Sequence, residues 1–148
     1  METILRKGIT GFGNVLCVNN DDINNILINI KYPYIYSDII EPQNDNNYFS
    51  VNIQNKINGL KFKLLCNGIY LVLAGVTMES KWMELKFINL PDDFIEQINN
   101  DVIMILPKEL LETKVPDGEI KILDKNEIAQ INYWKSKTYG EIIFNGYD

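Results

Sequence analysis

Residues 60–76 read LKFKLLCNGIYLVLAGV, and in this stretch two strand-like runs, 60–66 and 69–76, flank Asn67-Gly68. Asn-Gly between apolar runs is the strongest two-residue hairpin signal, because both central positions of a type I′ turn need a positive φ. The second run is apolar on both faces, which predicts a central strand. The stretch therefore predicts an antiparallel hairpin in the middle of a sheet.

Alternating apolar and polar residues extend the predicted sheet on both sides. Residues 83–87 (MELKF) and 49–54 (FSVNIQ) each place every second side chain on one face, the period expected of a half-buried strand. Residues 60–87 then form an antiparallel meander, with 49–54 as a further strand. The Asn- and Asp-rich residues 42–47 predict a loop.

Helical periodicity flanks these strands. Residues 19–30, 92–102 and 124–134 each begin with polar or acidic residues and carry apolar side chains three and four positions apart. Residues 102–106 fit either an extension of the second helix or a strand. Asp117-Gly118 predicts a turn, followed by a short strand at Ile120 and Ile122. The expected fold class is α+β, one domain over residues 1–148 with a mainly antiparallel sheet packed with a few helices.

Composition narrows the possible functions. The chain has 148 residues, a net charge of −6 and no histidine. Nucleic-acid binders need a basic patch, so direct binding to nucleic acid is not expected. The acidity fits a role in solubility, or imitation of nucleic acid toward a basic partner. No apolar run approaches the roughly 20 residues of a membrane span, and the start lacks a secretory signal pattern.

Two cysteines, Cys17 and Cys66, both lie in apolar strand-like context. This context predicts buried, reduced thiols rather than a disulfide. With the missing signal pattern, the thiols predict a cytoplasmic protein.

Motifs for catalysis or cofactor binding are weak. Without histidine there is no imidazole base and no Ser-His-Asp arrangement, and the two cysteines lack metal-ligand spacing. The glycines of residues 8–13 (GITGFG) lack the Lys-Ser/Thr of a phosphate loop, and a bend explains them better. Adjacent acids such as Asp92-Asp93 are typical of helix starts. The sequence therefore predicts no enzyme, no metal site and no cofactor.

Residues 133–148 read YWKSKTYGEIIFNGYD, which locally indicates a capped helix. Thr138 can accept from the backbone of Glu141, while the Glu141 carboxylate reaches back to the cap amide, as in a capping box. Tyr139, Ile142 and Ile143 then share one helical face. We expect this helix to pack into the core.

The same segment resembles the closing segment of small bacterial immunity proteins, which neutralise polymorphic toxins, including those of contact-dependent growth inhibition. The aromatic residue before the final Asp is a tyrosine here, Tyr147, which is a mild departure from the usual pattern of these proteins. The resemblance spans roughly a tenth of the chain. It is carried by Trp134, Thr138, Gly140, Glu141, Ile143, Phe144, Asn145 and Asp148.

The resemblance implies a protein that binds a cognate toxin domain one to one and blocks its active site or substrate cleft; the toxin would be a nuclease. Acids and tyrosines are the candidate contacts, since rigid aromatic rings beside charges suit an interface. We expect a strand over residues 32–36 to place its three tyrosines on one face. The candidate partner-binding residues are Asp92, Asp93, Glu96, Glu109, Glu112, Asp117, Glu119, Tyr32, Tyr34 and Tyr36.

An alternative of another class is a small ligand-binding or carboxylate-dependent enzyme domain. It would use a pocket over the sheet, lined by Tyr and Asp or Glu. A deep, polar-lined cavity would favour this alternative, and shallow surface grooves would favour the binding protein.

Overall fold

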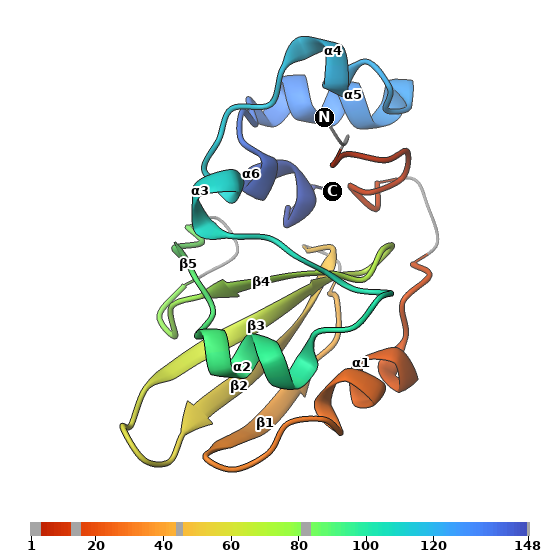
Figure 1. Ribbon diagram of the computed structural model, residues 1–148. Coiled ribbons are helices and arrows are strands. Elements are labelled where there is room, and N and C mark those ends of the chain that lie inside the picture. The colour runs from red at the N-terminus through yellow and green to blue at the C-terminus, as the bar shows by residue number, and fades with distance from the viewer. Residues whose placement is uncertain (1–3, 13–15, 44–45, 81–83, 148) are drawn as a thin grey trace.

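A computed structural model describes residues 4–12, 16–43, 46–80 and 84–147 (Figure 1). The predicted α+β class is confirmed, because a mainly antiparallel sheet packs with several helices. The strands are β1 (Tyr34–Ile40), β2 (Tyr48–Asn55), β3 (Lys61–Asn67), β4 (Val72–Val76), β5 (Phe87–Ile88) and β6 (Met104–Ile105). The helices are α1 (Asn20–Leu27), α2 (Asp92–Ile98), α3 (Lys108–Leu111), α4 (Asp117–Ile120), α5 (Lys125–Trp134) and α6 (Tyr139–Ile143).

The strands follow one another in the sheet in the order β1-β2-β3-β4-β5, each antiparallel to its neighbour. The order of the predicted meander β3-β4-β5 is therefore confirmed, but its third strand begins only at Phe87, Leu85 and Lys86 precede it, and Met83 lies outside the described residues. β6 pairs with β4 in parallel, which resolves residues 102–106 as a strand. β4 is buried along its whole length, as expected of the central strand.

One face of the sheet is covered by α1 and α2 (Figure 1). α1 begins at the cap Asn19, whose side chain and that of Asp22 form a capping box. α1 contributes apolar side chains at helical spacing, and Phe94 of α2 meets Phe62 of β3 edge to face, with ring centroids 5.2 Å apart. This core uses the inward residues of the predicted alternation, including Val51 and Ile53.

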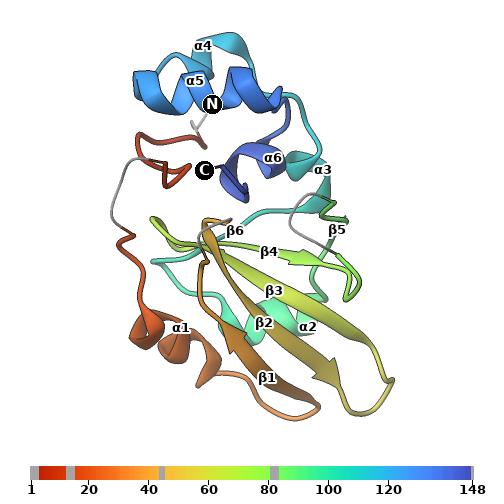
Figure 2. The same ribbon diagram turned by 180° about the vertical axis from the view of Figure 1, so that it is seen from behind.

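On the other face of the sheet lie the side chains of β2 to β4 that alternate with the residues packed under α1 and α2. Near one end of the sheet, α3 to α6 and residues 4–12 cover that face with a second core (Figure 1). Figure 2 shows that the same face lies open toward the far ends of β1 to β3. There the outward positions are polar and only half-buried, as at Asn52, Gln54 and Lys63.

The predicted type I′ turn at Asn67-Gly68 is wrong, although the two strands do form an antiparallel pair. Neither residue has a positive φ, and the connection runs to Val72. The Asn67 side chain accepts from the N–H groups of Ile69 and Tyr70, so it shapes a wider turn. Gly68 is needed for close approach instead, since a Cβ there would lie 2.8 Å from the Asn47 carbonyl oxygen.

Three further expectations are corrected. Ile120 and Ile122 do not form a strand, because residues 117–120 form α4, which begins after Pro116 with acids in its first turn. Val102 does not face inward, and α2 ends at Ile98. Cys17 is exposed, whereas Cys66 is buried as predicted; neither forms a disulfide.

Three buried asparagines tie the sheet to both outer segments of the described chain. We call Asn47, Asn67 and Asn145 the buried amide cluster. The Nδ2 groups of Asn47 and Asn67 donate to the carbonyl of Ile143 at 2.9 and 2.8 Å, and Asn145 Nδ2 donates to the carbonyl of Thr10 at 3.1 Å. Backbone groups that enter the core without strand partners are satisfied in this way.

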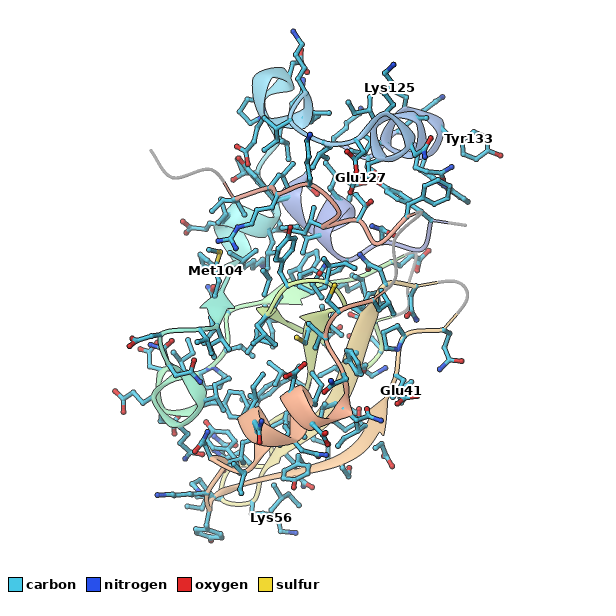
Figure 3. The ribbon with its side chains drawn as sticks, turned by 90° about the vertical axis from the view of Figure 1, so that its right-hand side faces the viewer. Glu41, Lys56, Met104, Lys125, Glu127 and Tyr133 are labelled. Atoms are coloured by element: carbon cyan, nitrogen blue, oxygen red, sulfur yellow. The ribbon has the colours of Figure 1, made fainter. Side chains whose placement is uncertain are left out.

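Glu127 holds residues 8–10 against α5. Its carboxylate is fully buried and accepts from the N–H groups of Gly8 and Thr10, at 2.8 and 3.1 Å, and from the Thr10 hydroxyl. It also accepts from the Asp124 N–H, which completes a capping box at the predicted start of α5. Figure 3 shows Glu127 between α5 and this segment. A buried carboxylate needs such a set of donors to replace water.

Candidate functional site

The three candidate tyrosines do not form one exposed strip. β1 begins only at Tyr34, which is buried; Tyr32 precedes the strand and is exposed. Tyr34 and Tyr36 do share a face, since they pair with Asn55 and Ile53, but Tyr36 is exposed near the edge. The expectation that a strand aligns all three rings is therefore wrong.

Burial gives Tyr34 a structural role. Its ring meets Phe94 edge to face at 5.1 Å, and its hydroxyl donates to Asp93 Oδ1 at 2.5 Å. Burial, followed by this bond to Asp93, raises the pKa of Tyr34. Two residues predicted for the site thus lie together, and both serve to attach α2 to β1.

The remaining candidate acids fall into two groups. Asp92 and Glu96 are exposed on α2, in the layer that covers one face of the sheet. The others belong to the opposite layer: Glu109, Glu112 and Asp117 are exposed on or beside α3 and α4, and Glu119 is half-buried. The structure therefore does not gather these acids on one surface.

Glu119 is engaged in internal bonds. Its Oε2 accepts from the N–H groups of Ile4 and Leu5, at 3.1 and 2.9 Å, and its Oε1 accepts from the Tyr139 hydroxyl at 2.7 Å. Burial and this bond to Glu119 raise the pKa of Tyr139 to about 12. Glu119 therefore fastens the first described residues to α4 and α6.

Of the apolar surface on β1, only Tyr36 was predicted from the sequence. Ile35, Tyr36, Ile39 and Ile40 are each more than a third exposed, and we call these four residues the β1 strip. β1 is the end strand of the sheet order, with β2 as its described neighbour. The available signal was the sequence YIYSDII, which is apolar on both faces.

A break in the strand divides the β1 strip. The register with β2 shifts between Ser37 and Ile40, where Asp38 has a φ of 58°. Such irregularities bend an edge strand and limit pairing with other chains. The Asp38 side chain accepts from Asn52 Nδ2 at 3.1 Å, which holds the break to β2. Ile35 and Tyr36 of the strip therefore lie in the regular part of β1, residues 34–37, and Ile39 and Ile40 lie at or beyond the break.

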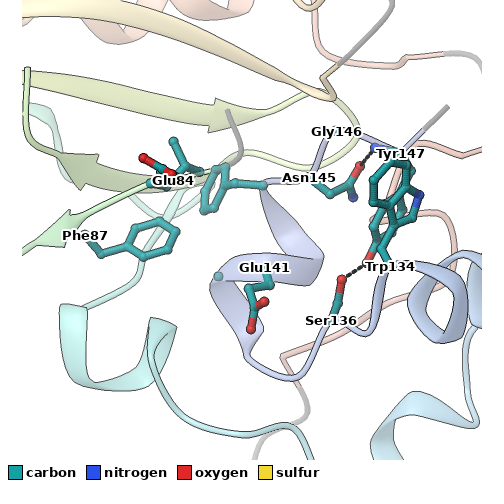
Figure 4. A pocket seen from close by; sticks show the side chains of 11 residues that line it. Glu84, Phe87, Trp134, Ser136, Glu141, Asn145, Gly146 and Tyr147 are labelled. Atoms are coloured by element: carbon teal, nitrogen blue, oxygen red, sulfur yellow. Dashed lines mark hydrogen bonds between the residues drawn. The ribbon is translucent and has the colours of Figure 1, made fainter. Parts of the chain in front are cut away.

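A pocket of about 330 Å³ lies beside α6, and we call it the α6 pocket. Figure 4 shows Phe87 and Glu84 on one side, Trp134 and Tyr147 on the other, and Glu141 between them. Phe87 and Phe144 lie with centroids 6.1 Å apart and ring planes tilted by 49°. The aromatic and acidic residues that line the pocket are Glu84, Phe87, Trp134, Glu141, Phe144 and Tyr147.

The walls of the α6 pocket are held by local bonds. The Tyr147 hydroxyl donates to Ser136 Oγ at 2.6 Å, and Trp134 Nε1 donates to Gln130 at 3.0 Å. Burial raises the pKa of Tyr147 to about 12; the bond to Ser136 opposes this, and the charge of Glu141 adds to it. Tyr147 therefore remains a neutral phenol near pH 7, which leaves the carboxylates of Glu84 and Glu141 as the charges in the described lining.

The predicted helix start provides the rigid wall of this pocket. Thr138 caps α6, and Glu141 Oε1 accepts from the Thr138 N–H and hydroxyl at 3.2 and 3.0 Å, so the capping box is confirmed. A Cβ on Gly140 would lie 2.4 Å from the Phe87 ring, so only glycine lets α6 approach β5 this closely. Three of the residues that carried the family resemblance, Thr138, Gly140 and Glu141, thus have capping or packing roles, and Asp148 lies outside the described residues.

A second hollow, of about 570 Å³, lies over the open face of the sheet. Its described lining includes Tyr48, Ser50, Lys63 and Glu84. One carboxylate beside a lysine does not supply the pair of acids that carboxylate-dependent hydrolysis uses. Among the described residues, no three Cys, Asp or Glu side chains are grouped to hold a metal ion.

No family model, curated protein or solved structure matches the chain. The function proposed below therefore rests on the sequence and on the geometry of the structure. Within the described ranges, no helix has the length and apolar character to cross a membrane.

Proposed function

We propose that this chain is an immunity-type inhibitor, which binds a cognate toxin domain one to one in the cytoplasm and blocks its active site or substrate cleft. The observation that carries the proposal is the β1 strip. Apolar patches exposed on an edge strand mark sites of protein–protein contact, and edge strands with no such role are usually shielded by charge or by neighbouring elements.

Ile35 and Tyr36 lie on opposite faces of β1, because they pair with Gln54 and Ile53, so the shape of β1 suits a partner that adds a strand to the edge of the sheet. Main-chain hydrogen bonds along residues 34–37 would supply affinity, and the side chains of Ile35 and Tyr36 would supply specificity. Tyr32 and Ile57, both more than two-thirds exposed, extend apolar surface beyond the strip.

Charge favours a basic partner. The net charge is −6, and Asp38 and Glu41 are exposed within or just after the strip. Nuclease toxins need a basic cleft to hold phosphate groups, so an acidic protein that covers the cleft gains electrostatic attraction and faster association. A nuclease domain is therefore the proposed target, and the resemblance of residues 134–148 to immunity proteins supports the same class.

The test is a pull-down of the tagged protein against the product of the neighbouring upstream gene, followed by calorimetry. We expect a one-to-one complex that weakens with added salt and abolishes the partner's toxicity. Ile35→Glu should weaken this complex at least tenfold, because the charge would be buried in an apolar contact.

Ile122→Glu is the matched control, since Ile122 is similarly exposed but lies in the α3 to α6 layer. Equal losses for both variants would point to a general effect of the substitution and would remove the β1 strip as the contact. A toxic partner that is not bound, or an upstream product with no toxicity, would overturn the proposed function itself.

A further inference from the structure

The α6 pocket combines two features that together select a cation. Aromatic faces attract positive charge through the ring quadrupole, and carboxylates attract it directly. Phe87 and Trp134 stand on opposite sides, with Glu84 and Glu141 in the same lining (Figure 4). No lysine or arginine is among the described lining residues, so the charge of this pocket is not neutralised from within.

The geometry favours a guanidinium group over an ammonium group. A guanidinium is planar, so its face can stack on an aromatic ring while its edge donates to a carboxylate. The bonds that hold Glu141 in the cap of α6 fall on Oε1, which leaves Oε2 to accept a charge-assisted hydrogen bond from the edge of the guanidinium. An ammonium is a strongly hydrated point charge, so it cannot stack on the flat aromatic rings as a guanidinium does.

Size and charge favour an arginine side chain on a protein over the free amino acid. The volume of about 330 Å³ is at the lower end of the roughly 300–1,000 Å³ typical of small-molecule sites, which suits one side chain. Free arginine also carries an α-ammonium and an α-carboxylate group, and both would have to lose water to enter a site of this size. We propose that the α6 pocket receives an arginine side chain of a partner protein.

The α6 pocket lies away from Ile35 and Tyr36 of the β1 strip, although Ile40 of the strip and Glu84 of the pocket both line the hollow over the open face of the sheet. The pocket is built by residues 84–87 and by the end of α5 and α6, whereas β1 lies at the opposite end of the strand order from β5. The proposal therefore concerns a second contact, and it holds for any partner that presents an arginine.

The test is an NMR titration of the isotope-labelled protein with Nα-acetyl-arginine N-methylamide. We expect saturable shifts of the Trp134 indole N–H and the Gly140 amide, with a dissociation constant on the order of 1 mM. The citrulline analogue has the same shape without the charge and should bind at least tenfold more weakly. Free arginine should bind several-fold more weakly than the blocked form, which distinguishes the two sources of guanidinium.

Two variants locate the effect. Glu84→Gln and Glu141→Gln should each weaken probe binding about tenfold, and Gln at 141 can still serve in the capping box, so the fold is retained. Asp21→Asn, at an exposed acid of α1, is the control and should leave binding unchanged. If the melting temperature of Glu141→Gln falls, that variant is set aside. Probe binding by Glu84→Gln, which changes an exposed residue, then tests the proposal alone.

Equal binding of the citrulline analogue, or unchanged affinity in Glu84→Gln, would overturn the proposal. So would shifts confined to residues outside the pocket. Because the titration contains no toxin, its outcome is independent of whether the β1 strip binds one.

Discussion

At the scale of single residues, the least conspicuous position in the sequence carries much of the structure. Glu127 lies three positions after Asp124, the spacing of an ordinary helix-capping residue, and nothing in the neighbouring sequence indicates a further role. The structure buries it completely, with donors from Gly8 and Thr10 at a separation of more than a hundred residues. A local pattern cannot reveal such a partner, because the donors belong to a distant irregular segment.

Glu127→Ala should therefore lower the free energy of unfolding by about 3 kcal/mol or more. The N–H groups of Gly8 and Thr10 and the Thr10 hydroxyl would lose their acceptor in the core, and each buried unpaired group costs about 1–3 kcal/mol. Urea denaturation measures the change. Asn126→Ala, at an exposed position one residue earlier, is the control. A loss below 1 kcal/mol would show that water replaces the carboxylate.

At the scale of elements, periodicity predicted β2, α1, α2 and α5, because each buries one face and alternates accordingly. It failed where tertiary contacts overrode local preference. Asn67-Gly68 fits a tight hairpin, yet Asn67 is committed to the carbonyls of Ile9 and Ile143. The same limit applies to the α6 pocket: Trp134 and Glu141 were noted in the sequence, but only the fold brings Glu84 and Phe87 opposite them.

Two glycines in helices should respond to alanine in opposite directions. Gly118→Ala in α4 meets nothing within 4 Å and should stabilise the protein by about 0.5–1 kcal/mol, through lower backbone entropy of the unfolded chain. Gly140→Ala in α6 should destabilise it by about 1–3 kcal/mol, because the new methyl group overlaps the Phe87 ring. Thermal unfolding compares the two. If Gly140→Ala is instead more stable than the parent protein, β5 moves to make room for the methyl group without a loss of stability.

At the scale of the whole molecule, buried acidic groups that keep their protons set the response to alkaline pH. The pKa values of Tyr139 and Tyr147 are raised to about 12 from 10.0, and burial raises that of the Cys66 thiol to about 12 from 9.0. Above these ordinary values the unfolded chain releases protons that the folded chain retains.

Stability should therefore be unaffected by these groups below about pH 9 and should fall as the pH rises from there to about 12. Unfolding by denaturant at stepped pH measures the slope. Tyr147→Phe removes one of the titrating groups, so its stability should fall less steeply between pH 10 and 12. An identical slope in this variant would mean that Tyr147 titrates alike in the folded and unfolded chains.

The buried amide cluster also constrains the order of events during synthesis. Thr10 contacts Asn145, a separation of 135 residues, and Ile9 and Ile143 share the donors of Asn67. A nascent chain that has not yet reached residue 143 can pair Asn47 and Asn67 with the carbonyls of Thr10 and Ile9, but the bonds of both side chains to the Ile143 carbonyl are still missing. The turn at residues 8–10 can therefore meet the sheet early, but the layer that covers this end of the sheet is completed only when residues 143–145 have been made.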